Sequence, residues 1–275
     1  MDLGVTMFVT DRSMCPDDLA RAVEERGLRS LWVPEHTHIP TSRVTPYPAG
    51  GDLPDEYTRT LDPFVALTAA AAATTTLRVG TCIALVAQRD PILTAKEVAS
   101  LDLISGGRFS FGVGFGWNVE EMHDHGTAPD ERRAIVRERV LAMQRLWADD
   151  EASFSGEHVE FPPSWSWPKP VQRPWPPVLV GTQAGPRAFR EIAEFADGWI
   201  PIGGRGISQA VPDLREAWAK AGREGEPTVI PIGFTIEEGK LEHYASLGIG
   251  DYILMLPSAP ADVILPILDR HAEHV

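Results

Sequence analysis

The sequence has little of what marks several large classes of protein. Only two of its 275 residues are cysteines, Cys15 and Cys82, and neither belongs to a CxxC pair, which argues against a zinc ribbon, a thioredoxin-type centre or a disulfide scaffold. The longest weakly polar run, residues 65–73, is far shorter than the ~20 residues that span a bilayer. The N-terminus has no basic region before an apolar run, so it predicts no secretory signal. We therefore expect a cytoplasmic protein with reduced thiols.

Positive charge is also scarce. The chain has 25 Lys and Arg against 39 Asp and Glu, which gives a net charge of −14, and it contains no basic stripe. This balance argues against nucleic acid and against an anionic membrane surface as partners. The 43% hydrophobic and 23% charged residues are ordinary for a globular protein. The length is compatible with one domain over residues 1–275.

Short apolar runs alternate with helical patterns along the whole chain. Strict alternation indicates parallel strands with right-handed crossovers, and eight such units in about 250–275 residues favour a (β/α)8 TIM barrel over the alternative, a doubly wound sheet. Two insertions interrupt the pattern, at 37–60 after the second strand and at 151–177 between the fourth helix and the fifth strand. The expected strands are 3–9, 31–33, 77–83, 109–113, 178–180, 199–201, 229–232 and 252–256. The expected helices are 16–27, 62–73, 91–105, 130–147, 186–196, 207–221, one ending near 247, and 260–271.

In a barrel of this kind, chemistry lies in the loops that follow the strands. Glu35 and His36 follow the second strand, and a carboxylate beside an imidazole can handle a proton near neutral pH. The alternative is a loop histidine satisfied by its neighbours. The spacing of His36 and His38 is also found in zinc hydrolases, but the other strand ends add no clear ligands, so we expect no metal site.

Two further strand ends are rich in glycine. Gly112, Gly114 and Gly116 do not form the dinucleotide-binding pattern and are more typical of a backbone that a flat ligand approaches closely. Residues 181–186, after the fifth strand, lead directly into a helix, whose free N–H groups favour a phosphate; the alternative is a plain βα turn. After the third strand, Arg89 is expected to pair with a nearby carboxylate. Residues 203–205 form a second, partly basic rim.

Seven stretches in the same order carry a resemblance to a known family. They are 31–40 (LWVPEHTHIP), 95–102 (AKEVASLD), 105–109 (SGGRF), 112–117 (GVGFGW), 167–172 (WPKPVQ), 176–181 (PPVLVG) and 196–199 (ADGW). Together they resemble the luciferase-like monooxygenase superfamily, and most of all its actinobacterial branch that uses the deazaflavin coenzyme F420. The resemblance extends from the first strand to about residue 201.

The resemblance implies the same barrel, with coenzyme F420 lying flat over its mouth. It implies His36 as proton donor or ring contact and Glu35 near the polar edge of the ring. It implies a non-proline cis peptide at Cys82–Ile83 behind the ring. The remaining residues expected at the coenzyme are Ala84 at the same bulge, Gly114, Gly116, Trp117 and Asn118 along the ring or its side chain, and Gly181, Thr182, Ala184 and Gly185 around the phosphate.

One position departs from part of the family. Some dehydrogenases carry a glutamate after the glycines of the fourth strand, whereas this chain has Trp117, with Glu120 and Glu121 further on. This difference argues against sugar-phosphate dehydrogenase chemistry. Trp117, with Trp165 or Trp167, suggests a flat or apolar small-molecule substrate, unless these residues belong to the core or to a dimer interface.

The resemblance therefore predicts hydride transfer between reduced deazaflavin and an unidentified small organic substrate, in either direction. The alternatives are an FMN-dependent monooxygenase of the same superfamily, a non-catalytic flavin- or deazaflavin-binding protein, and a metal hydrolase. The resemblance also implies a homodimer that pairs through helices near the second and third strands.

Overall fold

A single parallel sheet forms the centre of the molecule in a computed structural model that describes residues 1–202 and 206–275. Its strands lie in the order β10-β11-β1-β2-β3-β4-β7-β8-β9. The strands are β1 (Asp2–Thr6), β2 (Ser30–Val33), β3 (Arg78–Thr81), β4 (Phe109–Gly114), β7 (Val178–Thr182), β8 (Gly198–Pro201), β9 (Thr228–Val229), β10 (Ile232–Gly233) and β11 (Asp251–Met255).

The segment 228–233 closes this sheet into a barrel. Its first half, β9, pairs with β8, and its second half, β10, pairs with β11. The two halves correspond to the one strand expected at 229–232, so the barrel has eight strand positions, as predicted. The ends of the sheet are joined, which leaves few strand edges unpaired.

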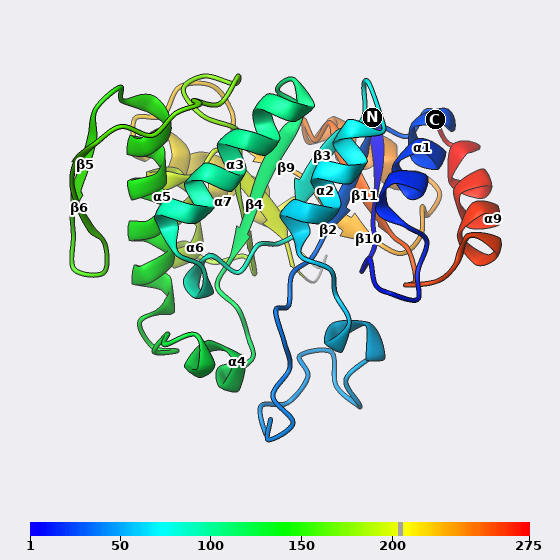
Figure 1. The fold of residues 1–275 in the computed structure, drawn as a ribbon. Coiled ribbons are helices and arrows are strands. Elements are labelled where there is room, and N and C mark those ends of the chain that lie inside the picture. Colours follow the sequence, from blue (N-terminus) through cyan, green and yellow to red (C-terminus); the bar gives the residue numbers. More distant parts are fainter. Residues whose placement is uncertain (203–205) are drawn as a thin grey trace.

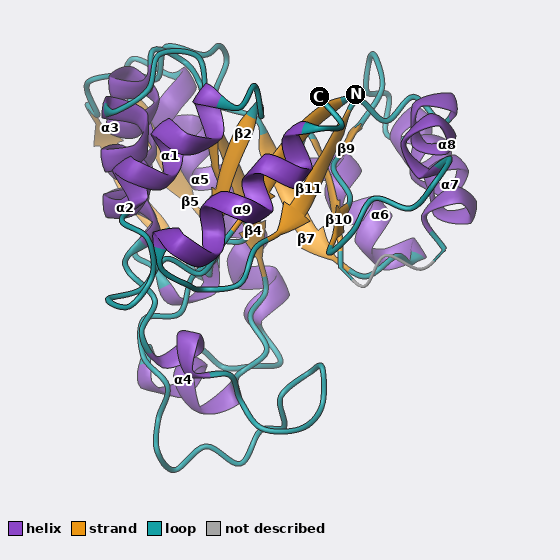
Figure 2. Cartoon of the chain, turned by 90° about the vertical axis from the view of Figure 1, so that its right-hand side faces the viewer, coloured by secondary structure: helices purple, strands orange, loops and turns teal. Residues whose placement is uncertain are grey.

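Helices surround the barrel on the outside (Figure 2). Four of them, α1, α2, α3 and α6, begin with proline in the first turn, where its missing N–H costs nothing. Asp62 and Asp90 cap α2 and α3 by accepting backbone N–H groups of the first turn. The helices are α1 (Pro16–Glu25), α2 (Pro63–Ala72), α3 (Pro91–Ser105), α4 (Val119–Asp124), α5 (Arg132–Ala148), α6 (Pro186–Phe195), α7 (Ile207–Lys220), α8 (Lys240–Ser246) and α9 (Ala261–Ala272).

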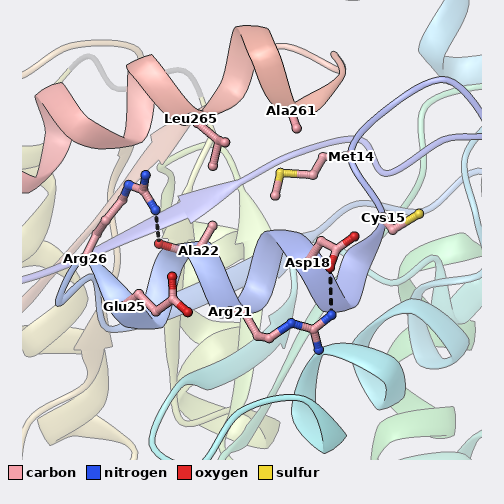
Figure 3. Close-up of a pocket in the computed structure, with 9 residues that line it drawn as sticks. All are labelled: Met14, Cys15, Asp18, Arg21, Ala22, Glu25, Arg26, Ala261 and Leu265. Atoms are coloured by element: carbon pink, nitrogen blue, oxygen red, sulfur yellow. Dashed lines mark hydrogen bonds and ion pairs between the residues drawn. The ribbon is translucent and has the colours of Figure 1, made fainter.

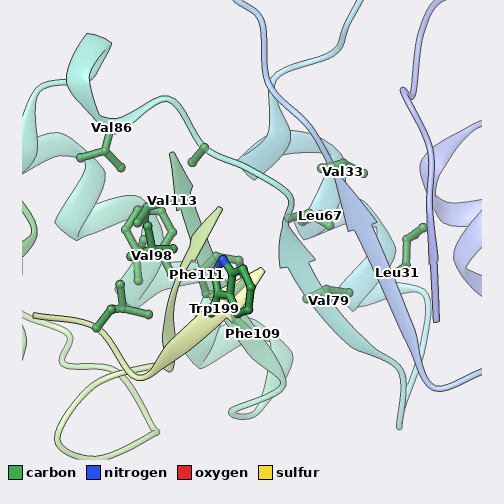
Figure 4. Packing of buried hydrophobic residues seen from close by; sticks show 14 of the residues in the cluster. Leu31, Val33, Leu67, Val79, Val86, Val98, Phe109, Phe111, Val113 and Trp199 are labelled. Atoms are coloured by element: carbon green, nitrogen blue, oxygen red, sulfur yellow. The ribbon is translucent and has the colours of Figure 1, made fainter. Parts of the chain in front are cut away.

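Two hydrophobic layers stabilise the fold, one between the barrel and the outer helices and one inside the barrel. The larger lies between strands and helices, where Phe109, Phe111 and Val98 are buried (Figure 4). The smaller lies inside the barrel and contains Trp32, Leu179, Ile200, Ile230 and Ile253. These inward side chains fill the barrel, so it is a packed core and not a pore.

The two predicted insertions are present. Residues 37–60 form a long loop with one short 3-10 helix, η1 (Asp55–Thr58), and residues 149–177 contain an antiparallel hairpin of β5 (Ala152–Ser155) and β6 (Glu160–Ser164). Figure 1 shows the first insertion and α4 projecting beyond the carboxyl ends of the strands, away from both chain termini. In the described part of the chain, no helix combines the length and hydropathy needed to cross a bilayer.

The expected strict alternation was wrong in one respect. The short helix α4 precedes α5 between β4 and the hairpin, so two helices follow β4 where one was predicted. A six-residue helix spans less than two turns, which is too short for hydrophobic periodicity to show in the sequence.

Candidate functional site

A buried histidine lies where β2 ends, at the mouth of the barrel. His36 is 8% exposed, and its Nδ1 lies 2.8 Å from Oε2 of Glu121, which has no exposed surface. The other carboxylate oxygen of Glu121 accepts the backbone N–H of Thr37 at 3.1 Å. An ionised carboxylate only accepts hydrogen bonds, so Nδ1 donates, and Nε2 takes no part in this pair. Within the described residues, Nε2 has no hydrogen-bond partner.

The partner of His36 was missed at the sequence level. Glu121 lies on α4, and Glu120, one residue earlier, points to a different side of this helix because successive residues are about 100° apart. Oε1 of Glu120 accepts the backbone N–H groups of Val44 and Thr45 at 2.8 and 3.1 Å. Hydrogen bonds from Thr45 and Val44 lower the pKa of Glu120 to about 2. The two adjacent glutamates thus fasten the first insertion to α4.

Aromatic rings surround His36. The ring centroids of Tyr57 and Trp117 lie 5.1 and 5.8 Å from that of His36. Tyr47 lies 5.3 Å from Tyr57 and 6.0 Å from Trp117. Phe8, after β1, is 4.5 Å from Tyr57. Both tyrosines come from the insertion, so this insertion supplies part of the site, as expected, although sequence analysis did not single out either tyrosine.

Glu35 is held inside the protein. Its Oε1 accepts Nε of Arg89 at 2.6 Å and its Oε2 accepts the backbone N–H of Leu85 at 2.6 Å. Arg89 also pairs with Asp62 and Glu97, which confirms the expectation that it binds carboxylates. Burial raises the pKa of Glu35, while Arg89 and the Leu85 N–H act in the opposite direction. With both oxygens engaged, Glu35 is placed to orient the end of β2 and the turn after β3.

The peptide bond between Cys82 and Ile83 is cis, as the resemblance implied. Burial raises the pKa of the Cys82 thiol to about 12. A Cβ added to Gly114 would lie 1.7 Å from Cδ1 of Ile83, and one added to Gly181 would lie 2.5 Å from its Cγ2. These two glycines therefore make room for the Ile83 side chain, a reason that the sequence did not indicate. Ala84, the next residue, is fully buried and pairs with Val113 in an isolated bridge.

Two buried amides near the mouth lack partners. Asn118, at the start of α4, is 1% exposed, and neither its Oδ1 nor its Nδ2 has a hydrogen-bond partner among the described residues. The same is true of Gln88, which is 8% exposed and whose Nε2 would lie 3.7 Å from a Cβ on Gly116. Gly116 itself has φ +73°, which favours glycine. Buried amides without partners are costly, so they suit a ligand with a polar edge.

The predicted phosphate segment leads from β7 to the N-terminus of α6. Gly181 is buried, Thr182 is half-buried and Ala184 is exposed. Gly185 precedes α6 without a side-chain cap, and a Cβ there would meet nothing within 4 Å. The first turn of α6 contains no acidic residue. An uncapped helix start beside open space is suited to an anion.

His38 and His125 belong to an exposed network next to this site. Thr37 Oγ1 lies 2.7 Å from Nε2 of His125 and 3.0 Å from Nδ1 of His38, and Nε2 of His38 lies 3.0 Å from Asp124. Within the described residues, the one group of three potential metal ligands is elsewhere, at Cys15, Asp17 and Asp18.

That group borders a surface cavity of about 490 Å³ between α1 and α9, shown in Figure 3. Arg21 pairs with Asp17 and Asp18 there, at 2.7 Å each. The cavity lies on the helical coat, away from His36. It adds no group to the site at the barrel mouth.

The expected position of Trp165 and Trp167 near the mouth was wrong. They are 79% and 56% exposed, and the carbonyl of Trp167 accepts Nζ of Lys96 on the outer helix α3. The buried carboxylate of Asp102, also on α3, accepts the N–H groups of Val171 and Gln172. The stretch 162–177 therefore packs on the helical coat. The rim expected at residues 203–205 lies outside the described residues.

Comparison with known proteins gives one family. A family model described as luciferase-like monooxygenase matches residues 17–238. An uncharacterized protein of Mycobacterium tuberculosis is 45% identical over 99% of this chain and 98% of its own. An F420-dependent glucose-6-phosphate dehydrogenase of Amycolatopsis mediterranei is 30% identical over 81% of this chain and 64% of its own. An FMNH2-dependent dimethylsulfone monooxygenase of Pseudomonas putida is 34% identical over 52% of this chain and 39% of its own.

Solved structures share the fold. A monooxygenase from Streptomyces bottropensis superimposes with a TM-score of 0.79 at 21% identity, covering 100% of this chain and 98% of the other. An F420-dependent secondary alcohol dehydrogenase in complex with an F420-acetone adduct gives 0.76 at 17% identity, with the same coverage. At these identities the likeness concerns the barrel alone.

Proposed function

Because the chain belongs to the luciferase-like monooxygenase family, we propose that it is an oxidoreductase that uses coenzyme F420 to transfer hydride to or from a small organic substrate. Relatives within the family include enzymes named for F420 and for FMNH2, and both kinds of enzyme are oxidoreductases. The choice of F420 rests on the compact chain and on the 81% coverage by the F420-dependent relative, against 52% by the FMN-dependent one.

The observation that carries the proposal is the pair of His36 and Glu121. Burial of both groups and the 2.8 Å contact hold the imidazole in one orientation, with Nδ1 toward the carboxylate. With a proton on both ring nitrogens, His36 can give the one on Nε2 to a substrate, and the neutral ring can take one there in the reverse direction. Glu121 acts as a positioning residue, because it touches His36 and the backbone of Thr37.

The residues around the mouth fit a bound deazaflavin. Ile83 would lie behind the ring, with Cys82 and Ala84 beside it in the bulge, and the amide of Asn118, unpartnered among the described residues, would offer both a donor and an acceptor to a polar ring edge. Gly116 and Trp117 flank the same end of β4. Thr182, Ala184 and Gly185 at the start of α6 would hold a phosphate. When bound, the coenzyme supplies the hydride, and the protein supplies orientation and the proton.

Glu35 enters this proposal with a changed role. Both of its oxygens are engaged by Arg89 and Leu85. We infer that Glu35 supports the loops that carry His36 and the cis peptide, instead of contacting the ring.

FMN is the second candidate. An FMN-dependent monooxygenase would use the same barrel and the same phosphate segment, and the Pseudomonas putida relative supports it. A reduced flavin bound here would consume oxygen without an organic electron acceptor, whereas a deazaflavin enzyme would not.

We also propose that the protein forms a homodimer and acts in the cytoplasm. Several apolar side chains on the outer faces of α2 and α3 support the dimer, among them Val65 at 68% exposed and Leu93 at 58%. Sedimentation equilibrium of the wild type and of Val65→Glu tests it. A monomeric wild-type protein at micromolar concentration would contradict the dimer.

The catalytic proposal is tested with His36→Asn, using His123→Asn as the matched control because His123 is exposed on the same helix as Glu121. We expect His36→Asn to bind oxidised coenzyme F420 with near wild-type affinity and to lose most turnover on a panel of carbonyl compounds. His123→Asn should keep both. Full turnover by His36→Asn would exclude His36 as the proton donor.

A further inference from the structure

The first insertion brings two phenol groups next to the proposed proton donor. The Tyr57 ring lies 5.1 Å from His36, and the hydroxyls of Tyr47 and Tyr57 are 3.3 Å apart. The cluster is fastened from the α4 side, where Glu120 holds Val44 and Thr45 and the Trp117 ring lies 6.3 Å from Tyr57. Contacts with α4 thus hold Tyr47 and Tyr57 in place next to His36.

Counting hydrogen bonds shows one donor left over. Two phenols carry two O–H protons, and their mutual hydrogen bond uses one of them. Neither hydroxyl has another partner among the described residues. Burial raises the pKa of Tyr57, so this phenol keeps its proton over the working pH range. One O–H of the pair therefore remains free, and the ring of Tyr57 lies 5.1 Å from that of His36.

We propose that Tyr57, accepting a hydrogen bond from Tyr47, donates its own O–H to the oxygen of the substrate, and that the substrate is an uncharged ketone or aldehyde or the corresponding alcohol. This inference rests on the proposed hydride transfer. A carbonyl oxygen, on which negative charge develops as the carbon is reduced, can accept from two donors at once, here the Tyr57 hydroxyl and Nε2 of a protonated His36.

In the direction of reduction, the carbonyl carbon gains a hydride, with its two electrons, from a reduced deazaflavin, which is thereby oxidised. The π pair of the C=O bond moves to oxygen, which takes the Nε2 proton of a doubly protonated His36 and leaves a neutral ring whose Nδ1–H still donates to Glu121. The Tyr57 hydroxyl stabilises the developing charge and keeps its proton. The reverse reaction oxidises the alcohol.

The charges around the site favour an uncharged substrate. Arg89 is committed to three carboxylates. Arg43 lies 5.8 Å above the Trp117 ring and donates to the carbonyl of Thr45. Arg43 pairs with no carboxylate among the described residues, whereas the carboxylate of Glu121 contacts His36 directly. A phosphate or carboxylate that accepted a hydrogen bond at His36 would meet repulsion from Glu121.

The test uses the full-length protein loaded with coenzyme F420. Tyr57→Phe keeps the ring and removes the hydroxyl. Tyr47→Phe removes the supporting phenol but leaves the Tyr57 O–H in place, and Tyr244→Phe, on α8 outside the site, is the control that should keep wild-type activity. For the reduction of cyclohexanone, we expect Tyr57→Phe to lower kcat/KM about tenfold to a hundredfold, as loss of a hydrogen bond to a charged oxygen does. Tyr47→Phe should change it less than about threefold, since the partner it removes is a neutral phenol. Glucose 6-phosphate should not be turned over.

A second readout does not depend on turnover. Isobutyramide carries a carbonyl oxygen that is not reduced, and its Kd can be measured by calorimetry on the same loaded proteins. We expect weaker binding to Tyr57→Phe than to Tyr47→Phe, at equal thermal stability. A purely structural role for the tyrosines would leave kcat/KM and Kd unchanged in Tyr57→Phe.

The outcomes separate the two proposals. Equal values for the wild type and Tyr57→Phe, or turnover of anionic substrates only, would overturn this inference while F420 binding stands. Coenzyme binding without turnover of any neutral ketone, aldehyde or alcohol would overturn the substrate class. Absence of F420 binding would overturn the proposed function itself, and this inference with it.

Discussion

Removing the guanidinium of Arg89 should destabilise the protein strongly. The Arg89 side chain is 12% exposed and that of Glu35 is 1% exposed, and they are joined at 2.6 Å. Arg89→Met would leave the Glu35 carboxylate buried without a cation, and breaking a buried pair in this way costs about 3–5 kcal/mol. Glu35→Gln removes one charge but leaves Arg89 paired with Asp62 and Glu97, so it should cost less, about 1.5–3 kcal/mol.

The assay is thermal and urea unfolding at one fixed protein concentration. About 3–5 kcal/mol corresponds to a fall in Tm of about 6–20 °C for a domain of this size. The loss in Arg89→Met should be smaller at pH 5.5 than at pH 8, because the isolated carboxyl group can take up a proton and escape the cost of a buried charge. Arg187→Met is the control and should change Tm little, because the Arg187 side chain is 67% exposed and its partner Glu191 keeps Arg133.

The result that would refute this reasoning concerns Glu35→Gln. If it left stability unchanged but abolished binding of coenzyme F420, then Glu35 would contact the coenzyme, and the supporting role inferred from its two internal hydrogen bonds would be wrong.

Three further predictions follow from single contacts. The folded-state pKa of Glu120 lies at about 2, below its ordinary value of 4.5, so the stabilisation of the insertion by Glu120 is complete above pH 4.5 and is lost as the pH falls toward 2. Glu120→Gln should therefore expose residues 37–60 to limited proteolysis at pH 7. Resistance equal to that of the wild type would contradict the anchoring role. Burial and a pKa of about 12 should leave Cys82 unreactive toward a thiol reagent at pH 8, so one thiol, the exposed Cys15, should titrate in the native protein and two in urea; two fast native thiols would contradict this. Gly114→Ala places a Cβ 1.7 Å from Cδ1 of Ile83 and should lower the free energy of unfolding by about 1–3 kcal/mol. Gly185→Ala is the control and should be tolerated, because nothing lies within 4 Å of its added Cβ. Equal unfolding midpoints for the two variants would contradict the packing argument.

The barrel could be predicted because each unit carries its own signals. Apolar runs of a few residues gave the strands, and prolines such as Pro16 and Pro91 marked helix starts. Parallel strands place their carboxyl ends at one edge, so the sequence alone predicts Glu35 and His36 at the mouth.

The positions of Glu121, Tyr47 and Tyr57 could not be predicted in this way. Glu121 reaches His36 only because the six-residue helix α4 turns it inward. Tyr47 and Tyr57 lie in an insertion without periodicity, and their positions depend on side-chain contacts such as those of Glu120. Tertiary contacts over more than 60 residues of sequence leave no local pattern.

Two interpretations of side-chain size were incomplete without the structure. Gly114 was expected to admit a flat ligand, yet its missing Cβ also makes room for Ile83. Trp165 and Trp167 were expected near the mouth, yet they lie on the helical coat. A glycine in a sequence indicates that space is scarce, and a tryptophan indicates that space must be filled. Neither indicates which neighbouring element occupies that space.

The most direct test of the account is a fluorescence titration of the coenzyme-free protein with oxidised coenzyme F420 and, separately, with FMN. The account predicts binding of the deazaflavin at micromolar concentration and much weaker binding of FMN. Tight binding of FMN with weak binding of F420 would contradict it and would favour a flavin-dependent monooxygenase.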